Sequence, residues 1–398
     1  MRLLLGGIPL GCDNIGDEAI LECVVAMLRR LMPGVELTVC TRDQSTARRL
    51  GIAAAPLYVF DRSLPEEDFT RLAAQHDAYL WCGATGLSDY PATALRLLRL
   101  ARQAGRPTLV WGVGLDSTLN PAFFRLRGKR RLVLQALSWL TLRQCYCVGY
   151  AERRLASAMR QRIRQELEHG RLVVVRDEET RQELERCGFQ CAVAAADTAS
   201  RLPTDGHAVP PRQPQERRIG FCVSAQRAIG DLDGIRDLWR RLLASPDTRI
   251  LCIPMNPVTD SRLMGAIRDE LPEELRARVL MLDTDLPAQV QGAAASCDAI
   301  VSSRLHLLIL AGNVRTPIIG VERGSKIRNY LRLFGLTPVC TVDDFDGAAI
   351  EAELMRLLSE AGAAAFRQQA TLAHEDMLRR LAEAEARLQK TLQDIDKN

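Results

Sequence analysis

Three side chains near residue 300 combine a group that can titrate near neutral pH with two cations. They are Arg304, His306 and Lys326, and they follow two short apolar runs of the chain. A histidine can give and take protons near pH 7. Cations at a helix N-terminus add to a site that already favours anions. The spacing therefore predicts acid–base chemistry on an anionic substrate.

A structural role is the alternative for each of these side chains. A lone histidine in an apolar segment is usually a packed core residue, and Arg304 could form a surface ion pair. Lys326 is harder to explain in this way, because only four of the 53 Lys and Arg residues are lysines. A compact ammonium group suits a phosphate, whereas arginine suits planar carboxylates.

The elements around these residues form one α/β unit. Residues 299–301 and 317–321 are apolar runs typical of buried strands, and residues 304–311 suffice for about two helical turns between them. Ser302 and Ser303 are favoured helix N-caps. A Gly-containing loop follows the second strand. Polar residues beyond the carboxyl ends of parallel strands lie in the ligand crevice, and all three candidates are expected there.

The composition is that of an ordinary globular protein with more than one domain. The chain has 398 residues, of which 47% are hydrophobic and 26% are charged. A net charge of +4 is too small for a nucleic-acid footprint, and aromatics at 5% are too sparse for base stacking. No nucleic-acid partner is expected. The Ala- and Arg-rich, Lys-poor usage is typical of bacterial genomes of high GC content.

The twelve cysteines include no paired CxxC sets, so no zinc site or other metal site is predicted. The first apolar run breaks at Gly6 and Gly7, which predicts no signal peptide. No stretch approaches the roughly 18 apolar residues of a membrane span. We therefore expect a cytoplasmic protein.

Strand-like and helix-like segments alternate along most of the chain. Predicted strands cover residues 1–7, 35–40, 78–81, 108–113, 172–175, 219–223, 249–253, 279–282, 299–301 and 317–321. This rhythm predicts an α/β fold with parallel sheets covered on both faces. We predict two Rossmann-like parallel α/β domains that face a cleft, where ligands are expected to bind.

Composition also predicts the domain boundaries. An N-terminal α/β domain covers residues 1–200, and the proline-rich residues 201–217 form a linker. A C-terminal α/β domain covers residues 218–345, and helices occupy residues 346–398. A basic insertion at residues 121–170 is expected to form one or two long helices packed on the domain. The alternative for this insertion is an in-plane contact with a membrane surface.

The first domain supplies its own polar strand ends. Residues 6–18, GGIPLGCDNIGDE, form a Gly-rich loop that is neither GxGxxG nor Walker A. The loop carries Asn14, Asp17 and Glu18 into the first turn of the next helix. Its glycines permit close approach of a ligand, or else the loop only packs helix on strand. Arg176 follows another predicted strand and should point into the same crevice.

These motifs, in this order, resemble the polysaccharide pyruvyl transferase family. The matching pieces are residues 14–21 (NIGDEAIL), Arg176-Asp177, residues 303–306 (SRLH) and Lys326. The resemblance covers most of residues 1–340. It implies a fold like that of two-domain, GT-B-type glycosyltransferases.

The resemblance also implies an activity. Such enzymes transfer the pyruvyl group of phosphoenolpyruvate to two hydroxyls of a sugar, which gives a cyclic ketal. The sugar belongs to a cell-wall or extracellular polysaccharide, or to its lipid-linked precursor. Phosphoenolpyruvate is then a co-substrate, and no cofactor is expected.

Roles for individual residues follow from the resemblance in the same way. It implies that His306 is the catalytic acid/base and that Arg304 belongs to the catalytic site. Arg304, Lys326 and Arg176 are expected to bind the phosphate and carboxylate of the donor, and Ser303 also lies on the donor side. Asn14, Asp17 and Glu18 are expected to line the acceptor side. Two departures from the family pattern, at residues 82–84 (CGA) and 115–116 (LD), lie in the first domain. They concern the acceptor more than the donor.

Two other functions are compatible with the sequence. One is a GT-B glycosyltransferase that takes a nucleotide-sugar donor, with Lys326 and Arg304 on the diphosphate. The other is a non-catalytic glycan- or lipid-binding scaffold that uses the basic insertion and the C-terminal helix. The acceptor sugar and the oligomeric state are left open by the sequence.

Overall fold

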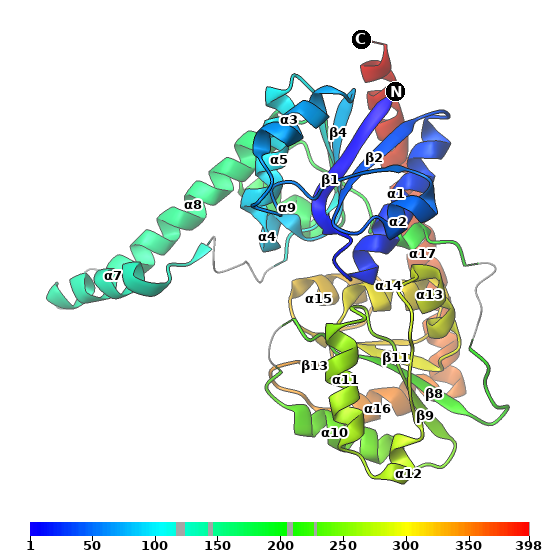
Figure 1. The fold of residues 1–398 in the computed structure, drawn as a ribbon. Helices are drawn as coiled ribbons and strands as arrows, with labels where there is room; N and C mark the ends of the chain where they lie inside the picture. The colour runs from blue at the N-terminus through cyan, green and yellow to red at the C-terminus, as the bar shows by residue number, and fades with distance from the viewer. Residues whose placement is uncertain (117–123, 142–145, 205–209, 227–228, 398) are drawn as a thin grey trace.

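Two α/β domains are stacked one above the other, and a long C-terminal helix runs beside both (Figure 1). The computed structural model describes residues 1–116, 124–141, 146–204, 210–226 and 229–397.

The first domain is built on a seven-stranded parallel sheet. Its strands are β1 (Arg2–Leu10), β2 (Glu36–Thr41), β3 (Ala53–Ala55), β4 (Ala78–Cys82), β5 (Thr108–Val113), β6 (Leu172–Val175) and β7 (Val193–Ala194), in the order β3-β2-β1-β4-β5-β6-β7. The connecting helices are α1 (Ile15–Leu31), α2 (Ser45–Leu50), α3 (Glu66–Ala74), α4 (Gly86–Asp89), α5 (Pro91–Gln103) and α9 (Glu178–Arg186). The central strands are buried along nearly their whole length, as expected for a sheet covered on both faces.

The second domain repeats the arrangement with six parallel strands. They are β8 (Arg217–Cys222), β9 (Thr248–Cys252), β10 (Val279–Met281), β11 (Ala299–Ser302), β12 (Ile318–Glu322) and β13 (Cys340–Thr341), in the order β10-β9-β8-β11-β12-β13. The helices are α10 (Leu232–Leu242), α11 (Thr259–Asp269), α12 (Glu273–Arg276), α13 (Pro287–Ala295), α14 (Leu305–Asn313) and α15 (Ser325–Arg332). The prediction of two Rossmann-like parallel domains is confirmed.

All ten predicted strands are present, and three more were not predicted. These three, β3, β7 and β13, are two or three residues long and lie at sheet edges. Such short runs carry no periodic signal that could separate them from loops.

The basic insertion forms a helical hairpin that projects from the first domain, whereas the sequence predicted helices packed on it (Figure 1). Its helices are α7 (Gly128–Leu140) and α8 (Cys147–Glu168). The base of the hairpin is fixed to α5, because Arg99 Nε donates to Glu166 Oε1 at 2.8 Å and Arg102 Nη2 donates to Glu166 Oε2 at 2.7 Å.

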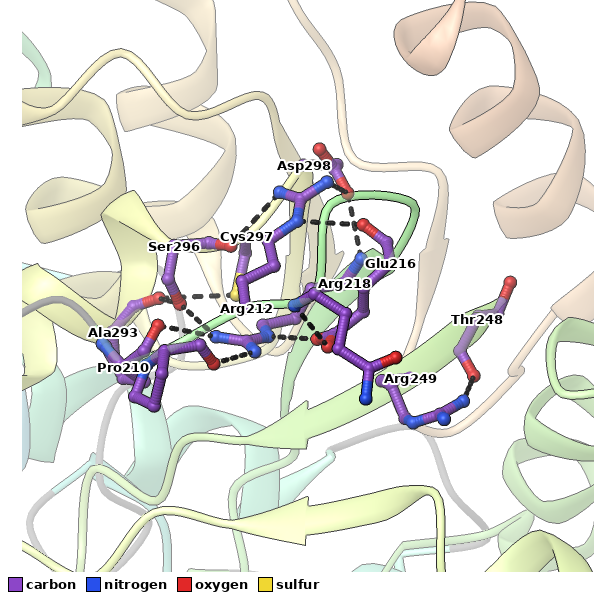
Figure 2. Close-up of polar contacts among 12 residues, drawn as sticks. Pro210, Arg212, Glu216, Arg218, Thr248, Arg249, Ala293, Ser296, Cys297 and Asp298 are labelled. Atoms are coloured by element: carbon purple, nitrogen blue, oxygen red, sulfur yellow. Dashed lines mark hydrogen bonds and ion pairs between the residues drawn. The ribbon is translucent and has the colours of Figure 1, made fainter. Parts of the chain in front are cut away.

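A buried arginine fixes the chain where it enters the second sheet (Figure 2). Arg218, on β8, is 1% exposed, and its Nε donates to Glu216 Oε1 at 2.7 Å. Its two Nη atoms donate to Ser296 Oγ at 3.0 Å and to the carbonyl groups of Pro210 and Pro211 at 3.2 and 2.7 Å. The Arg218 guanidinium therefore holds the end of the proline-rich segment against the sheet, and Arg212 adds an ion pair with Asp298 at 2.9 Å.

The C-terminal helices α16 (Gly347–Leu358) and α17 (Glu360–Asp396) follow the second sheet, and α17 returns to the first domain (Figure 1). Leu381 and Leu388 are fully buried, and so is Glu385, which interrupts the leucine pattern between them. Glu385 Oε2 accepts hydrogen bonds from Arg30 at 2.7 Å and Arg201 at 3.1 Å. The polar residue in the apolar stripe therefore binds α17 to the first domain.

The Arg218 network predicts a large loss of stability when its centre is removed. Arg218→Met leaves the Glu216 carboxylate buried without its partner, and breaking a buried pair in this way costs about 3–5 kcal/mol of unfolding free energy. Arg217→Met is the matched control, because Arg217 is exposed and should change stability by less than about 0.5 kcal/mol. Urea denaturation followed by circular dichroism measures both. Equal stability of the two variants would contradict the structural role of the network.

Candidate functional site

The carboxyl ends of both sheets face each other across one cavity of about 150 Å³. Its polar lining consists of Asn14, Asp17, Thr85, Asp89, Tyr90 and Arg176 from the first domain, and of Ser224, Gln226, Ser303, Arg304, His306, Arg323 and Lys326 from the second. All the predicted site residues except Glu18 are thus brought together. The residues that line this cavity are far apart in the sequence, because they follow seven different strands.

His306 lies in the first turn of α14 and is enclosed by the first domain. Gly16, in the first turn of α1, lies so close that a Cβ atom there would be 2.1 Å from His306 Nδ1. On its other side, His306 Nε2 is 3.6 Å from Asp197 Oδ2. The imidazole therefore sits between a glycine and a carboxylate that both belong to the opposite domain.

Asp197 was not singled out from the sequence. It caps a short 3-10 helix, η1 (Thr198–Arg201), where Oδ1 accepts from Ala199 N at 3.0 Å. Its Oδ2 is also 3.8 Å from Arg176 Nη1. Burial acts to raise the pKa of Asp197, but the contact with His306 and the charge of Arg176 outweigh it and lower the pKa. The Asp197 carboxylate therefore helps to hold the imidazole in place.

Arg176 follows β6 directly and is buried. Its Nε is 3.3 Å from Asp177 Oδ2. Among the residues that the structure describes, no group accepts a hydrogen bond from Nη2. Gly114 makes room for this group, since a Cβ atom there would be 2.4 Å from Nη2. A buried guanidinium with an unused donor at a cavity wall is suited to bind an anion.

The two serines after β11 do not cap α14, contrary to the prediction. Arg304 is the N-cap residue, with extended backbone angles of φ −103° and ψ 118°. Ser302 Oγ accepts from Arg304 N at 2.9 Å, and Ser303 Oγ accepts from Ser224 N at 2.9 Å. The Ser303 hydroxyl therefore joins the end of β11 to the chain that follows β8, whereas the Ser302 hydroxyl bonds within its own turn. The helix starts later than predicted.

The Arg304 side chain is fixed by Asp260, a residue of α11 that sequence reasoning missed. Arg304 Nε donates to Oδ2 at 2.9 Å and Nη2 donates to Oδ1 at 2.7 Å. Asp260 is 0% exposed and also accepts from the backbone N–H groups of Ala225 and Asn256. This two-point pair sets the plane of the guanidinium, and Nη1 takes no part in it.

Lys326 lies in the first turn of α15, not in a loop as predicted. Its Nζ is 4.0 Å from Oδ2 of Asp116 in the first domain. Asp116 Oδ1 also accepts from Ser325 N at 2.8 Å, and Gly324 allows this approach, since a Cβ atom there would be 2.4 Å from Oδ2. Burial lowers the pKa of Lys326, while Asp89 and Asp116 act in the opposite direction.

Asp17 combines burial with a place in the cavity wall. Asn14 caps α1 by accepting from Gly16 N at 3.2 Å, and its Nδ2 donates to Asp17 Oδ2 at 2.7 Å. Burial raises the pKa of Asp17 to about 6, with Glu18 acting in the same direction and His306 in the opposite one. A carboxyl group that titrates near 6 can both accept and return a proton near neutral pH.

Glu18 lies apart from the other predicted residues. It lines a neighbouring hollow between the Gly-rich loop and α2, and its Oε1 accepts from Gly11 N at 2.9 Å. Its carboxylate therefore holds the loop in place. Within the described ranges, no group of three or more His, Cys, Asp or Glu side chains is arranged to hold a metal ion.

A larger cavity of about 270 Å³ adjoins the first. The two share Arg176, Leu305 and Lys326, and the larger one is otherwise walled by α9, α14, α15 and α17. A ligand in either cavity would therefore contact the same two cations.

One protein-family model matches most of this chain. The family model described as polysaccharide pyruvyl transferase matches residues 14–325, a range that contains every residue of the site except Lys326. The chain belongs to the polysaccharide pyruvyl transferase family. It is therefore a transferase, and the resemblance seen in its motifs is confirmed. No curated protein matches the sequence significantly.

Solved structures similar to this transferase show the same two-domain fold. Anabaena HepE, solved in complex with UDP-glucose, has a TM-score of 0.62 and 11% identity over 99% of this chain and 100% of its own. S. aureus MnaA, in a co-structure with UDP, has a TM-score of 0.60 and 11% identity over 97% of this chain and 94% of its own. UDP-GlcNAc 2-epimerase from Neisseria meningitidis, bound to UDP-GlcNAc, has a TM-score of 0.58 and 12% identity over 99% of this chain and 100% of its own. At these identities the likeness establishes the GT-B-like fold alone.

The raised pKa of Asp17 predicts a pH-dependent cost in stability. The pKa of Asp17 is about 6 in the folded protein and near 3.8 ordinarily, so between these values the folded state binds more protons than the unfolded state. The Asp17 contribution to unfolding free energy therefore falls as pH rises from 4 to 6. Asp17→Asn should remove this fall and gain up to about 2–3 kcal/mol over the wild type at pH 7.

Urea denaturation at several pH values between 4 and 7 measures this difference. Asp13→Asn is the matched control, because Asp13 lies in the same loop with an exposed side chain. The stability difference between Asp13→Asn and the wild type should not vary with pH. A constant difference for Asp17→Asn as well would show that Asp17 ionises normally in the folded protein.

Proposed function

We propose that this transferase moves the pyruvyl group of phosphoenolpyruvate to two hydroxyls of a sugar as a cyclic ketal. The observation that carries the proposal is the meeting of Arg176, Lys326 and His306 in one interdomain cavity of a chain of this family. Phosphoenolpyruvate carries a carboxylate and a phosphate, and both must be neutralised when the donor leaves water.

Two side chains in this cavity are suited to hold the donor. The unused Nη2 of Arg176 and the ammonium group of Lys326 can each receive one anionic group of phosphoenolpyruvate. Arg304, whose guanidinium is fixed by Asp260, adds a third positive charge at the same wall, next to Ser303. Because these cations are held before the donor arrives, they need no reorganisation during the reaction.

The proton transfers are assigned to His306 and Asp17. His306 gives its proton to C3 of the enol, and C2 becomes electrophilic. The first sugar hydroxyl forms a bond to C2 while its proton passes to Asp17. The C2–O bond to phosphate then breaks, and the departing phosphate takes the proton that Asp17 had accepted. The second hydroxyl attacks C2 and gives its proton to His306, so both side chains return to their starting states. Two protons thus leave the sugar hydroxyls, while C3 and the phosphate each gain one.

Asp197 supports this sequence by keeping the imidazole oriented before the donor binds. General acid–base groups of this kind typically contribute about 10²- to 10⁴-fold to a rate. Neither transfer requires a cofactor in this scheme, which uses phosphoenolpyruvate only as co-substrate.

The acceptor is assigned to the first-domain wall of the cavity, where Asn14 and Asp17 lie. We propose a cell-wall or extracellular polysaccharide, or its lipid-linked precursor, as the source of the sugar. Because phosphoenolpyruvate is a cytosolic metabolite, the proposed reaction takes place in the cytoplasm.

A nucleotide-sugar glycosyltransferase is the second candidate, and the UDP and UDP-sugar complexes of the structural neighbours favour it. The two candidates differ in the donor that stabilises the folded protein. A ligand at 100 times its dissociation constant adds about 2.7 kcal/mol to the unfolding free energy. We expect phosphoenolpyruvate, and not UDP-glucose, to raise the melting temperature. The opposite result would replace the proposed donor with a nucleotide sugar.

Two substitutions test the residue roles through phosphate release from phosphoenolpyruvate, with N-acetylmannosamine- and galactose-type glycosides as acceptors. His306→Ala should lower kcat by about 10²- to 10⁴-fold, because the variant lacks the group that the scheme assigns to protonate C3. Lys326→Met should raise the KM for phosphoenolpyruvate at least about tenfold, the loss expected for one charge-assisted hydrogen bond.

The exposed residues His169 and Lys390 provide matched controls, as His169→Ala and Lys390→Met. Both control variants should keep the wild-type kinetic constants. Full activity of His306→Ala would remove the proposed acid, and an unchanged KM for Lys326→Met would remove Lys326 from the donor site.

A further inference from the structure

The projecting hairpin exposes an unusual amount of apolar surface. Seven of the twelve exposed large hydrophobic side chains in the described part of the chain lie on it. Five belong to α7, namely Leu132, Val133, Leu137, Trp139 and Leu140, and their exposure ranges from 44% to 80%. The other two are Tyr146 and Tyr150 at the start of α8. A contiguous exposed apolar face of this kind marks an interaction surface.

The orientation of α7 is the reverse of that of an ordinary surface helix. At 3.6 residues per turn, its five exposed hydrophobic residues fall on one side of the helix. The opposite side faces α8 through Ser138, which is buried. Ser138 Oγ donates to Leu134 O at 2.8 Å and accepts from Cys147 N at 2.9 Å. A surface helix normally turns its apolar side toward the core, whereas α7 turns it away from the protein.

The charge of the chain is concentrated in the same segment. Residues 121–170 contain eleven Arg and Lys against three Glu, which is a net charge of +8. The whole chain carries +4, so the other 348 residues carry −4. Lys129, Arg130 and Arg131 are exposed and directly precede the apolar side chains of α7. The hairpin therefore combines an outward apolar face with a local excess of positive charge.

We propose that α7 docks in the plane of an anionic phospholipid bilayer. Trp and Leu on one face with flanking Lys and Arg are what a helix needs to lie in the interface between headgroups and acyl chains. Each basic residue near an anionic leaflet adds about 1 kcal/mol of attraction. A 13-residue helix such as α7 is only about 20 Å long. No helix in the described ranges has the length and apolarity to cross a bilayer, so α7 contacts one leaflet.

Charge and apolarity together favour a membrane over other partners. A second copy of the hairpin would bring a charge of +8 against +8, and like charges in contact oppose association. A nucleic acid would satisfy the basic side chains but would leave the Trp139 and Leu140 face in water. An anionic bilayer satisfies both features at once. The inference does not depend on which group the transferase moves.

The protein carries its own probe for this docking. Trp139 is 64% exposed, while the other three tryptophans, Trp81, Trp111 and Trp239, are 0% exposed. A blue shift of tryptophan emission on adding vesicles to the full chain therefore reports on Trp139. We expect a shift, and co-flotation of the protein, with vesicles that contain about one-third phosphatidylglycerol. Pure phosphatidylcholine vesicles should bind at least about tenfold less, as should anionic vesicles in about 0.5 M salt.

Two double variants, each with a matched control, separate the apolar and charged contributions to vesicle binding. Trp139→Glu with Leu140→Glu should lower vesicle binding more than tenfold. Met355→Glu with Leu372→Glu makes the same charge change at two hydrophobic residues that are also exposed, on α16 and α17, and should bind like the wild type. Arg130→Glu with Arg131→Glu should also lower binding more than tenfold. Its control is Arg262→Glu with Arg387→Glu, at exposed arginines outside the hairpin.

Circular dichroism melts show whether each variant is folded, and all substituted side chains are exposed. The proposal is overturned if the wild type does not float with anionic vesicles at low salt. It is equally overturned if the hairpin variants and their controls bind alike. A concentration-dependent dimer that is lost in Trp139→Glu with Leu140→Glu, without vesicle binding, would assign the face to a second copy instead.

Discussion

The contact between Gly16 and His306 is the constraint on which the site depends. Gly16 opens α1 in the first domain and His306 opens α14 in the second, and there is no space for even a methyl group between them. Two further contacts also bring the two domains close together. Gly324 admits Asp116 on one side of the site, and Ile15 N donates to Met255 O at 3.0 Å on the other. Neither domain alone contains the site, because its walls meet only when the strand ends of both sheets are in contact.

Close apposition has an electrostatic cost, and the carboxylates of the site offset part of it. His306 is matched by Asp197 and Lys326 by Asp116, in each case across the domain boundary. Arg304 is matched by Asp260 within its own domain. Burial of such charges is favourable only when each has a partner of good geometry. The domain interface is thus held closed by the same ion pairs that position the candidate catalytic groups.

Asp17 is the exception to this pattern. Its only described hydrogen-bond donor is the neutral amide of Asn14, and burial raises its pKa to about 6. A carboxyl group kept in this state costs stability near neutral pH, and a raised pKa in a cavity wall is a common feature of functional sites. The Asn14 side chain both caps α1 and holds the Asp17 carboxyl group in the wall, and its hydrogen bond acts to lower the pKa that burial raises.

Local sequence signals located most of the fold and site, and tertiary contacts explain what was missed. Apolar runs that end in Arg176 or in Ser303 and Arg304 identify buried strands with polar ends, and the parallel-sheet rule places those ends in one crevice. Asp116 also follows a predicted strand, at residues 108–113, but Asp197 and Asp260 carry no such signal. Each of the three carboxylates matters through a partner between 44 and 210 residues away, and the sequence does not show which residues meet.

Two local features were also misjudged for a physical reason. Ser302 and Ser303 are good N-cap types, but Arg304 is the N-cap residue of the helix. The Ser303 hydroxyl joins the end of β11 to the chain after β8, and the Ser302 hydroxyl accepts from the backbone N–H of Arg304. Glu385 interrupts a leucine stripe and weakens the sequence signal of α17. In the folded protein Glu385 forms ion pairs with Arg30 and Arg201. The residue that interrupts the stripe therefore binds α17 to the first domain.

A double-mutant cycle on Gly16 and His306 tests the central claim most directly. Gly16→Ala should lower the unfolding free energy by about 1–3 kcal/mol, the usual cost of overpacking. In a His306→Gly background the added methyl group meets no imidazole, so the cost should fall to within about 0.5 kcal/mol of zero. Gly265→Ala on α11, where nothing lies within 4 Å, should be neutral or stabilising in both backgrounds. An equal cost of Gly16→Ala with and without the His306 side chain would show that the two domains do not meet at this contact.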